Sequence, residues 1–218
     1  MPLPFVLNEQ PSIADHYIAQ LRDKDVQQDR WRFRQNMERL GNLLAYEMSK
    51  QLAYESYEVE TVLGKADSRR VQSTMVLGTI LRAGLPFHQG TLYAFDDAEN
   101  AFISAYRKHH KNGTFEIEIE YVSCPNLKDK ILVIADPMLA TGASMVLAVN
   151  ALRRFGVPSE VHVLAAIAAE AGVDYVRQEL PYAKLWLGAV DAELTAQSYI
   201  APGLGDAGDL SYGEKIQR

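Results

Sequence analysis

Four short apolar runs, each nearly free of polar residues, limit the folds open to this chain more than any other feature. They span residues 75–81, 131–135, 161–168 and 185–190. Runs of this length without polar alternation are typical of strands buried on both faces, as in a parallel sheet, although a short run also fits a buried helix segment. Segments with helical periodicity, 144–155 and 172–180, lie between the later runs and end near Gly156 and Pro181. The alternation predicts an α/β fold in which helices cover both faces of a parallel sheet.

A long amphipathic helix is predicted before the first of these runs. From residue 29 to about residue 54, apolar side chains recur at spacings of three and four, at Met37, Leu40, Leu44, Met48 and Leu52. Such spacing places them on one side of a helix, so this stripe must pack against another surface.

Residues 114–121 alternate strictly between apolar and acidic side chains. Phe115, Ile117, Ile119 and Tyr121 alternate with Glu116, Glu118 and Glu120. The turn dipeptide Asn112-Gly113 precedes this segment and residues 101–106 also have strand character, so the sequence predicts a β-hairpin arm projecting from the sheet. The glutamates are typical of a solvated strand face, which we favour over a pair of catalytic carboxylates.

The composition is that of a globular protein and disfavours two classes of partner. Of the 218 residues, 48% are apolar and 23% are charged, and the formal net charge is −6. Because no repeat or low-complexity linker interrupts the chain, residues 1–218 are expected to form a single domain. An acidic chain without a dense cluster of Lys and Arg is unsuited to nucleic acid or an anionic membrane as its main partner.

The sequence also bears on compartment and metal binding. Cys124 is the only cysteine, which rules out an intrachain disulfide and argues against a zinc site of the Cys/His type. The first residues, MPLPFVLNEQ, lack the basic and apolar regions of a signal peptide, and no window approaches about 18 uninterrupted apolar residues. The chain is therefore expected in the cytoplasm and not in a membrane.

Residues 131–144, ILVIADPMLATGAS, have the clearest chemical signature. A buried strand delivers Asp136 to the carboxyl edge of the sheet, where open α/β folds bind ligands, and we expect its carboxylate to be exposed. The turn that follows carries Thr141, Gly142 and Ser144, and the N–H groups of a helix start can hold a phosphate together with two hydroxyls. A carboxylate beside that phosphate can accept hydrogen bonds from a ribose diol, so the segment fits a ribose 5-phosphate site. It also fits a simple helix cap, and without a Lys after a glycine it is not a P-loop.

Four segments resemble, in order, the motifs of one enzyme family. Residues 136–144 resemble the phosphoribosyl diphosphate (PRPP) signature of uracil phosphoribosyltransferases. Residues 80–84, ILRAG, are similar to the diphosphate-binding turn of that family, and Tyr106-Arg107 to its second arginine site. Residues 199–209, YIAPGLGDAGD, resemble its C-terminal uracil-recognition loop, which is specific to the uracil branch. The resemblance extends from about residue 15 to residue 213.

This resemblance implies a type I phosphoribosyltransferase fold, with a small hood formed by the N-terminal segment and the C-terminal loop, about residues 191–213. It implies that uracil reacts with PRPP to give UMP and diphosphate. Asp136, Arg82 and Arg107 are then the expected catalytic residues, with both arginines facing the diphosphate. Mg²⁺ is the expected cofactor, held mainly by substrate oxygens and water rather than directly by the protein.

The resemblance also implies which residues contact each substrate. The expected PRPP-binding residues are Arg82, Arg107, Asp136, Pro137, Met138, Leu139, Ala140, Thr141, Gly142, Ala143, Ser144 and Asp206. The expected uracil-binding residues are Ile200, Gly205, Asp206 and Ala207, which would act largely through backbone groups. A homodimer or larger homo-oligomer is implied as well, with the long helix and the hairpin arm as candidate interfaces.

Two positions depart from the family pattern. Ala143 stands where the family usually has Gly; a methyl group there is costly if φ is positive and harmless if the residue begins the helix, and we favour the second. Residues 108–111, KHHK, follow Arg107 where an acidic residue is common, and they fit a solvated hairpin tip better than an electrostatic guide for PRPP.

Other motifs have simpler interpretations. Residues 203–208 match the dinucleotide motif GxGxxG, but only ten residues follow Gly208, too few for the unit that this motif must open. His16, His88 and His162 are isolated and are expected to be packing or surface residues. Trp31 and Trp186 are expected to anchor the core or an interface.

Two further functions stay open at this point. A regulator that kept the nucleotide-binding fold and lost turnover would be consistent with Ala143. A transferase for another base is the second; many purine and orotate enzymes of this fold carry two adjacent acids at the strand end, whereas here Ala135 precedes Asp136, which favours uracil.

Overall fold

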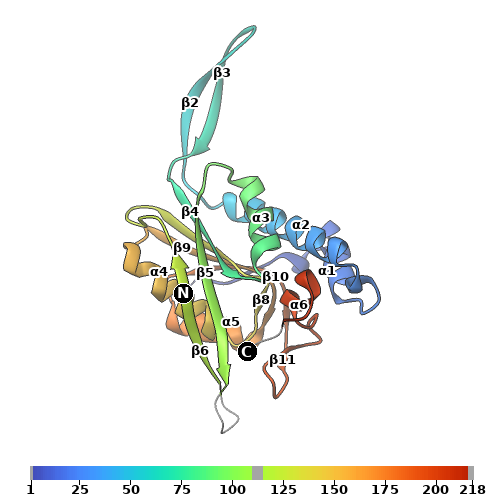
Figure 1. The fold of residues 1–218 in the computed structure, drawn as a ribbon. Helices are drawn as coiled ribbons and strands as arrows, with labels where there is room; N and C mark the ends of the chain where they lie inside the picture. Colours follow the sequence, from blue (N-terminus) through green and yellow to red (C-terminus); the bar gives the residue numbers. More distant parts are fainter. Residues whose placement is uncertain (1, 110–114, 216–218) are drawn as a thin grey trace.

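A computed structural model describes residues 2–109 and 115–215, without the side chains of residues 106–109 and 115–118. Its centre is an eight-stranded sheet in the order β1-β10-β9-β7-β4-β5-β6, with the short β8 beside β9 (Figure 1). The strand pairs of this sheet are parallel, except that β5 is antiparallel to β6. The strands are β1 (Phe5–Val6), β4 (Met75–Leu81), β5 (Glu99–His109), β6 (Phe115–Ser123), β7 (Ile131–Ala135), β8 (Met138–Leu139), β9 (Glu160–Ala169) and β10 (Lys184–Asp191).

The four apolar runs are strands of this sheet, as predicted. β4 and β7 have the predicted bounds, and β9 and β10 are each longer by one residue at either end. Successive side chains enter different core clusters: in β7, Val133 and Ala135 pack on one side of the sheet and Leu132 and Ile134 on the other. Because both sides are apolar, these strands need no polar face, which explains their uninterrupted sequences.

Helices cover both faces of the sheet. Helices α1 (Ile13–Arg22), α2 (Arg30–Ser49) and α3 (Leu85–Ala94) lie on one face, and α4 (Ala143–Leu152) and α5 (Glu170–Glu179) on the other (Figure 1). The remaining short elements are α6 (Ala207–Tyr212), the 3-10 turns η1 (Leu7–Glu9), η2 (Val26–Gln28) and η3 (Arg153–Phe155), and the strand pair β11 (Glu193–Leu194) and β12 (Ile200–Ala201). The predicted α/β class, a mainly parallel sheet flanked by helices, is confirmed.

Helix α2 is the predicted long amphipathic helix, but it ends at Ser49 rather than near residue 54, where β2 begins. It begins after Asp29, whose Oδ1 accepts hydrogen bonds from the N–H groups of Trp31 and Arg32 at 3.1 Å each. The predicted apolar residues are all buried, so the stripe packs against the sheet as required. Trp186 also lies in the core, whereas Trp31 is 61% exposed and does not anchor it.

Two hairpins extend from the body, and the sequence predicted one of them. β5 pairs with β6 as expected, although residues 110–114, at the expected tip, lie outside the described residues. β5 pairs with β4 only as far as Ser104, so the β5–β6 hairpin continues past the sheet. The second hairpin, β2 (Tyr54–Thr61) with β3 (Gly64–Val71), stands well away from the body (Figure 1). Its side chains are mostly polar and exposed, so its sequence has no apolar pattern from which a hairpin could be predicted.

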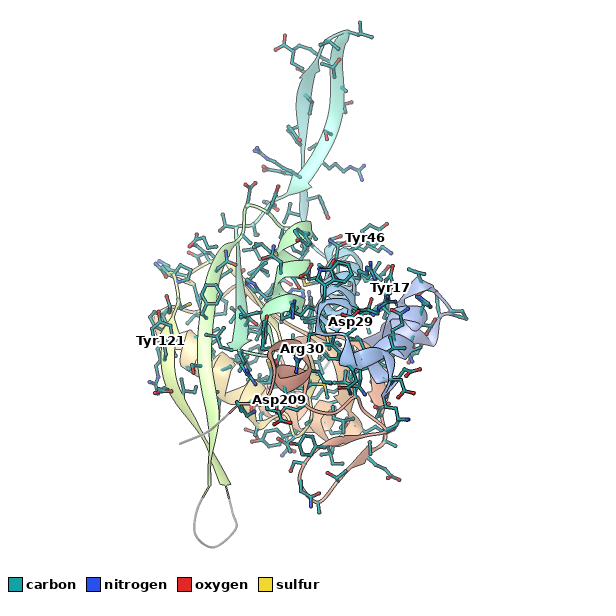
Figure 2. All side chains as sticks on the ribbon, turned by 45° about the vertical axis from the view of Figure 1, so that its right-hand side comes forward. Tyr17, Asp29, Arg30, Tyr46, Tyr121 and Asp209 are labelled. Atoms are coloured by element: carbon teal, nitrogen blue, oxygen red, sulfur yellow. The ribbon has the colours of Figure 1, made fainter. Side chains whose placement is uncertain are left out.

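The alternation predicted for residues 114–121 breaks near its end. Ile119 and Val122 pack against the core, whereas Tyr121 is 56% exposed at the outer strand of the sheet (Figure 2). The β5–β6 register shifts between Ser104 and Ala105, which pair with Tyr121 and Ile119 in turn. This irregularity turns Tyr121 away from the core, so the prediction that it shares the apolar face of Ile119 is wrong.

None of the helices in the described ranges combines the length and the apolar character that crossing a membrane requires.

Candidate active site

Asp136 lies directly after β7, at the carboxyl edge of the sheet, as the sequence predicted. Its backbone N–H donates to the carbonyl of Leu164 at 3.1 Å, which ties the start of the turn to β9. The side chain is half-buried rather than exposed, which corrects the expectation of an exposed carboxylate. Burial raises the pKa of Asp136 to about 7, and within the described ranges no cation or hydrogen-bond donor offsets that effect. This carboxyl group therefore changes charge near neutral pH, which is typical of groups at functional sites.

The turn after Asp136 leads directly into helix α4. β8 pairs with β9 and brings the chain to Gly142, the N-cap of α4, where φ is +80°. Ala143 is already the first helical residue, so its methyl group is harmless, as we expected. Gly142 has no side chain to cap the helix, and Thr141 Oγ1 accepts only one long hydrogen bond, 3.4 Å from the Ala143 N–H. The first turn of α4 can therefore offer N–H groups to an anion such as a phosphate.

The Arg82-Ala83-Gly84 turn follows the neighbouring strand β4 and packs against the end of β7. Thr79 Oγ1 donates to the carbonyl of Ala135 at 3.0 Å, which fixes β4 beside β7 where both strands end. A Cβ placed on Gly84 would lie 3.1 Å from that same carbonyl oxygen. The peptide bond between Leu81 and Arg82 is cis. The predicted diphosphate turn and the predicted ribose carboxylate thus occupy adjacent positions on one edge.

The C-terminal loop buries several of its apolar side chains. Ile200 and Ala207 are 5% and 3% exposed, so these side chains belong to the core. Gly205, with φ +94°, separates the buried Leu204 from Asp206, the N-cap of α6. Ile200 and Ala207 can therefore offer a planar base mainly their backbone N–H and C=O groups.

Asp206 is held as a carboxylate by its neighbours. Burial by itself raises the pKa of Asp206. Two contacts outweigh that effect: the N–H of Asp209 lies 3.0 Å from Oδ1, and the ammonium of Lys215 lies 3.4 Å from Oδ2. The net pKa is therefore below the usual value. The pKa values of Asp206 and Asp136 are thus shifted in opposite directions, so at neutral pH Asp206 is charged whereas Asp136 is only partly so.

Two residues that sequence reasoning missed, Arg22 and Asp191, fasten the loop to the body. The Arg22 guanidinium makes two hydrogen bonds to the Asp191 carboxylate, both 2.7 Å long, and a third to the Gly203 carbonyl at 3.1 Å. Asp191 Oδ2 also accepts the Gly203 N–H at 2.9 Å. Asp191 is the last residue of β10, so an acid at the end of a buried apolar run, like Asp136, was the signal that could have identified it.

The structure brings the Arg82 turn and the C-terminal loop together. Arg82 binds Asp209 of the C-terminal loop, and a Cβ on Gly208 would lie 3.2 Å from Asp206 Oδ1 and 3.7 Å from Ala83 Cβ. Arg107 is in β5, beyond the last pair with β4, and its side chain lies outside the described part of the chain.

The described residues contain no group of three His, Cys, Asp or Glu side chains that could bind a metal ion by itself. Asp136 and Asp206 are carboxyl groups of the predicted site that can act as oxygen donors. Such a site suits a hard divalent ion that keeps most of its ligands from water and substrate phosphates, as Mg²⁺ does.

Comparison with known proteins agrees with this geometry. The family model described as uracil phosphoribosyltransferase matches residues 8–213. The chain belongs to the uracil phosphoribosyltransferase family. A uracil phosphoribosyltransferase of Porphyromonas gingivalis is 48% identical over 211 residues, covering 96% of this chain and 98% of the relative. One from Pyrococcus furiosus is 34% identical over 203 residues, covering 92% and 86%.

A solved structure of an Aquifex aeolicus protein has the same fold as this member of the uracil phosphoribosyltransferase family. The TM-score is 0.87 at 32% identity, over 99% of this chain and 100% of that one. The family resemblance and the fold that it implied are confirmed.

Proposed function

We propose that this chain transfers the phosphoribosyl group of PRPP to N1 of uracil and releases UMP and diphosphate. The observation that carries the proposal is the meeting of Asp136, the Arg82 turn and the C-terminal loop at one sheet edge, in a chain of this family. In this reaction a bond forms between N1 and the anomeric carbon, the bond from that carbon to the diphosphate breaks, and N1 loses its proton. Negative charge grows on the leaving diphosphate, so positioning and charge stabilisation supply most of the catalysis.

Each part of the site has a role in this proposal. Arg82 and Arg107 face the diphosphate, which an acidic protein must neutralise locally. The ribose hydroxyls bind Asp136, and the 5-phosphate binds residues 138–144 through the N–H groups at the start of α4. Mg²⁺ is the proposed cofactor; when bound, it neutralises charge on the diphosphate, with Asp136 and Asp206 as the carboxyl groups that could orient its water ligands.

Uracil recognition is assigned to the backbone of Ile200 and of residues 205–207. The side chains of Ile200 and Ala207 are buried, which supports a role in shaping the loop rather than in polar recognition. Backbone donors and acceptors that match the N3–H and carbonyl groups of uracil would be mismatched by cytosine, which has an amino group and an unprotonated N3. Unpaired polar groups of that kind can reject an analogue by several orders of magnitude.

We further propose a homodimer or larger homo-oligomer in the cytoplasm, formed from single-domain subunits with a hood over the substrate site. The hydrogen bond from Arg22 to the Gly203 carbonyl supports a hood made jointly from the N-terminal segment and the C-terminal loop. The exposed β2–β3 hairpin supports self-association, since an isolated two-stranded hairpin is only marginally stable in water.

The test is a turnover assay with Mg²⁺, PRPP and a panel of radiolabelled bases. We expect UMP from uracil and no nucleotide from cytosine, hypoxanthine or orotate. PRPP binding without any product would instead identify a regulator that has lost turnover, and a different nucleotide product would identify a transferase for another base.

A further inference from the structure

Arg82 is held by the C-terminal segment through one of its three guanidinium nitrogens. Arg82 Nη2 donates to Asp209 Oδ1 at 2.5 Å and to the Gly213 carbonyl at 2.8 Å. Within the described residues, Nε and Nη1 of Arg82 have no hydrogen-bond partner. The guanidinium is therefore fixed at one end and keeps two donor groups for another anion.

Asp209 is itself well placed to hold that guanidinium. Its N–H donates to Asp206 Oδ1 at 3.0 Å, and its carbonyl accepts the N–H of Gly213 at 2.8 Å. Both backbone groups of Asp209 are thus fixed in α6, and its carboxylate is directed to Arg82. Figure 2 shows Asp209 on α6, near Arg30 at the start of α2. The side chains of Arg82 and Asp209 are 34% and 31% exposed, so a ligand can still reach the pair.

The contact also joins the two loops that bind different substrates in the proposed function. A Cβ placed on Gly208 would lie 3.6 Å from Arg82 Nε, so the backbone of the C-terminal loop limits where the arginine can move. A long flexible side chain loses considerable entropy when a ligand fixes it, and an arrangement that exists before binding reduces that loss.

We propose that Asp209 is a positioning residue for the PRPP reaction: it holds Arg82 at Nη2, and a remaining N–H of the same guanidinium, on Nε or Nη1, donates to the diphosphate. In this role the Asp209 carboxylate acts on PRPP through Arg82, whose guanidinium binds Oδ1. This role rests on the proposed assignment of Arg82 to the diphosphate.

The test compares ligands with and without a diphosphate group. Binding of PRPP, inorganic diphosphate and UMP is measured calorimetrically with Mg²⁺ for the full chain and for Asp209→Asn. We expect the Kd for PRPP and for diphosphate to rise about tenfold, as for contacting residues that are coupled, and the Kd for UMP to change less than about twofold. The matched control is Glu179→Gln, which removes the same charge from the opposite edge of the sheet and should leave all three constants unchanged.

A double-mutant cycle separates positioning from a purely structural role. In the Arg82→Gln background, Asp209→Asn should have no further effect on PRPP binding, because no guanidinium is left to position. Asp209→Glu keeps the charge and should limit the loss to about threefold; it also replaces the Asn variant if that protein does not fold.

Three results would overturn the assignment: tighter PRPP binding in Asp209→Asn, an equal loss for UMP, or a full loss in the Arg82→Gln background. Tighter binding would mean that Asp209 competes with diphosphate for the arginine. If the unmodified chain makes no UMP from uracil and PRPP, the proposed function fails instead, which is a separate outcome.

Discussion

At the scale of single residues, Asp136 is a proposed catalytic group whose carboxyl is shielded from water by burial. Its pKa is about 7 in the folded chain, against an ordinary value of 3.8. The folded state therefore binds a proton more tightly than the unfolded state. The contribution of Asp136 to stability is greatest below about pH 4 and is lost as the pH rises through 7.

Replacing Asp136 with Asn should stabilise the protein at alkaline pH and lower its catalytic activity. We expect Asp136→Asn to have a larger free energy of unfolding than the unmodified chain at pH 8, by at most about 4 kcal/mol, and nearly the same free energy at pH 4. Losing a charge-assisted hydrogen bond to the ribose should lower kcat/KM by a factor corresponding to about 1.5 to 3 kcal/mol. Thermal unfolding across this pH range tests the effect on stability, and steady-state kinetics tests the effect on activity. An unchanged kcat/KM would remove Asp136 from the site.

His162 is a second buried titratable residue, and it has a structural role. Its Nδ1 accepts the Trp186 indole N–H at 3.1 Å, and its Nε2 lies 3.3 Å from Glu160 Oε2, so a neutral ring with the proton on Nε2 satisfies both contacts. Burial, followed by the charge of Lys184, lowers its pKa to about 4, despite the opposing effect of Glu160. A proton on Nδ1 would face the indole N–H and break that hydrogen bond.

This arrangement predicts a loss of stability in acid. The pKa of His162 is 6.5 when the chain is unfolded and about 4 when it is folded. The free energy of unfolding should therefore fall by up to about 3 kcal/mol as the pH drops across that interval. In His162→Asn, whose side-chain oxygen can still accept the indole N–H, the melting temperature should depend less steeply on pH between 4 and 6.5. The slope is the measurement; identical slopes would show that other groups control acid unfolding.

At the scale of elements, the start of α4 shows how one glycine and one alanine differ. Gly142 has φ +80°, and a Cβ there would lie 2.8 Å from the Gly172 carbonyl oxygen, whereas Ala143 is helical. Gly142→Ala should therefore destabilise the protein by about 1 to 3 kcal/mol and weaken PRPP binding. Ala143→Gly, which restores the usual family residue, should cost no more than about 1 kcal/mol and leave PRPP binding intact. Denaturant titration ranks the two variants, and the reverse order would contradict the assigned helix start.

At the scale of the whole molecule, the β2–β3 hairpin has no packing partner within the described chain that matches its length. Val62 and Leu63 at its tip are fully exposed, at 101% and 97%. Its strands pair only with each other, from Tyr54 with Val71 to Thr61 with Gly64. An arm of this shape, with apolar residues at its end, is suited to pack against a second copy of the chain.

Removing the arm tests that role directly. Glu55 and Arg70 are paired across the hairpin, so replacing residues 56–69 with Asn-Gly joins them through a two-residue turn. We expect the shortened chain to sediment as a smaller species than the full chain, with its far-ultraviolet circular dichroism otherwise retained. An unchanged oligomer would assign self-association to another surface, such as the helices α1–α3.

The sequence was sufficient for features that depend on neighbours along the chain. Burial on two faces produced the apolar runs that became β4, β7, β9 and β10, and helical spacing located the buried stripe of α2. Contiguous motifs indicated the family and the phosphate turn, because backbone geometry at a strand–helix junction is encoded locally. The polar arm β2–β3 lacked such a pattern and was missed.

Features that depend on contacts between distant segments could be read only from the folded chain. Arg82 and Asp209 are 127 positions apart, and Arg22 and Asp191 are 169 apart, so no local pattern could pair them. The register shift that exposes Tyr121 depends on a partner strand, and the raised pKa of Asp136 depends on the atoms that exclude water from it. Periodicity and motif are properties of adjacent residues, whereas ion pairing and desolvation arise only when the folded chain brings remote groups together.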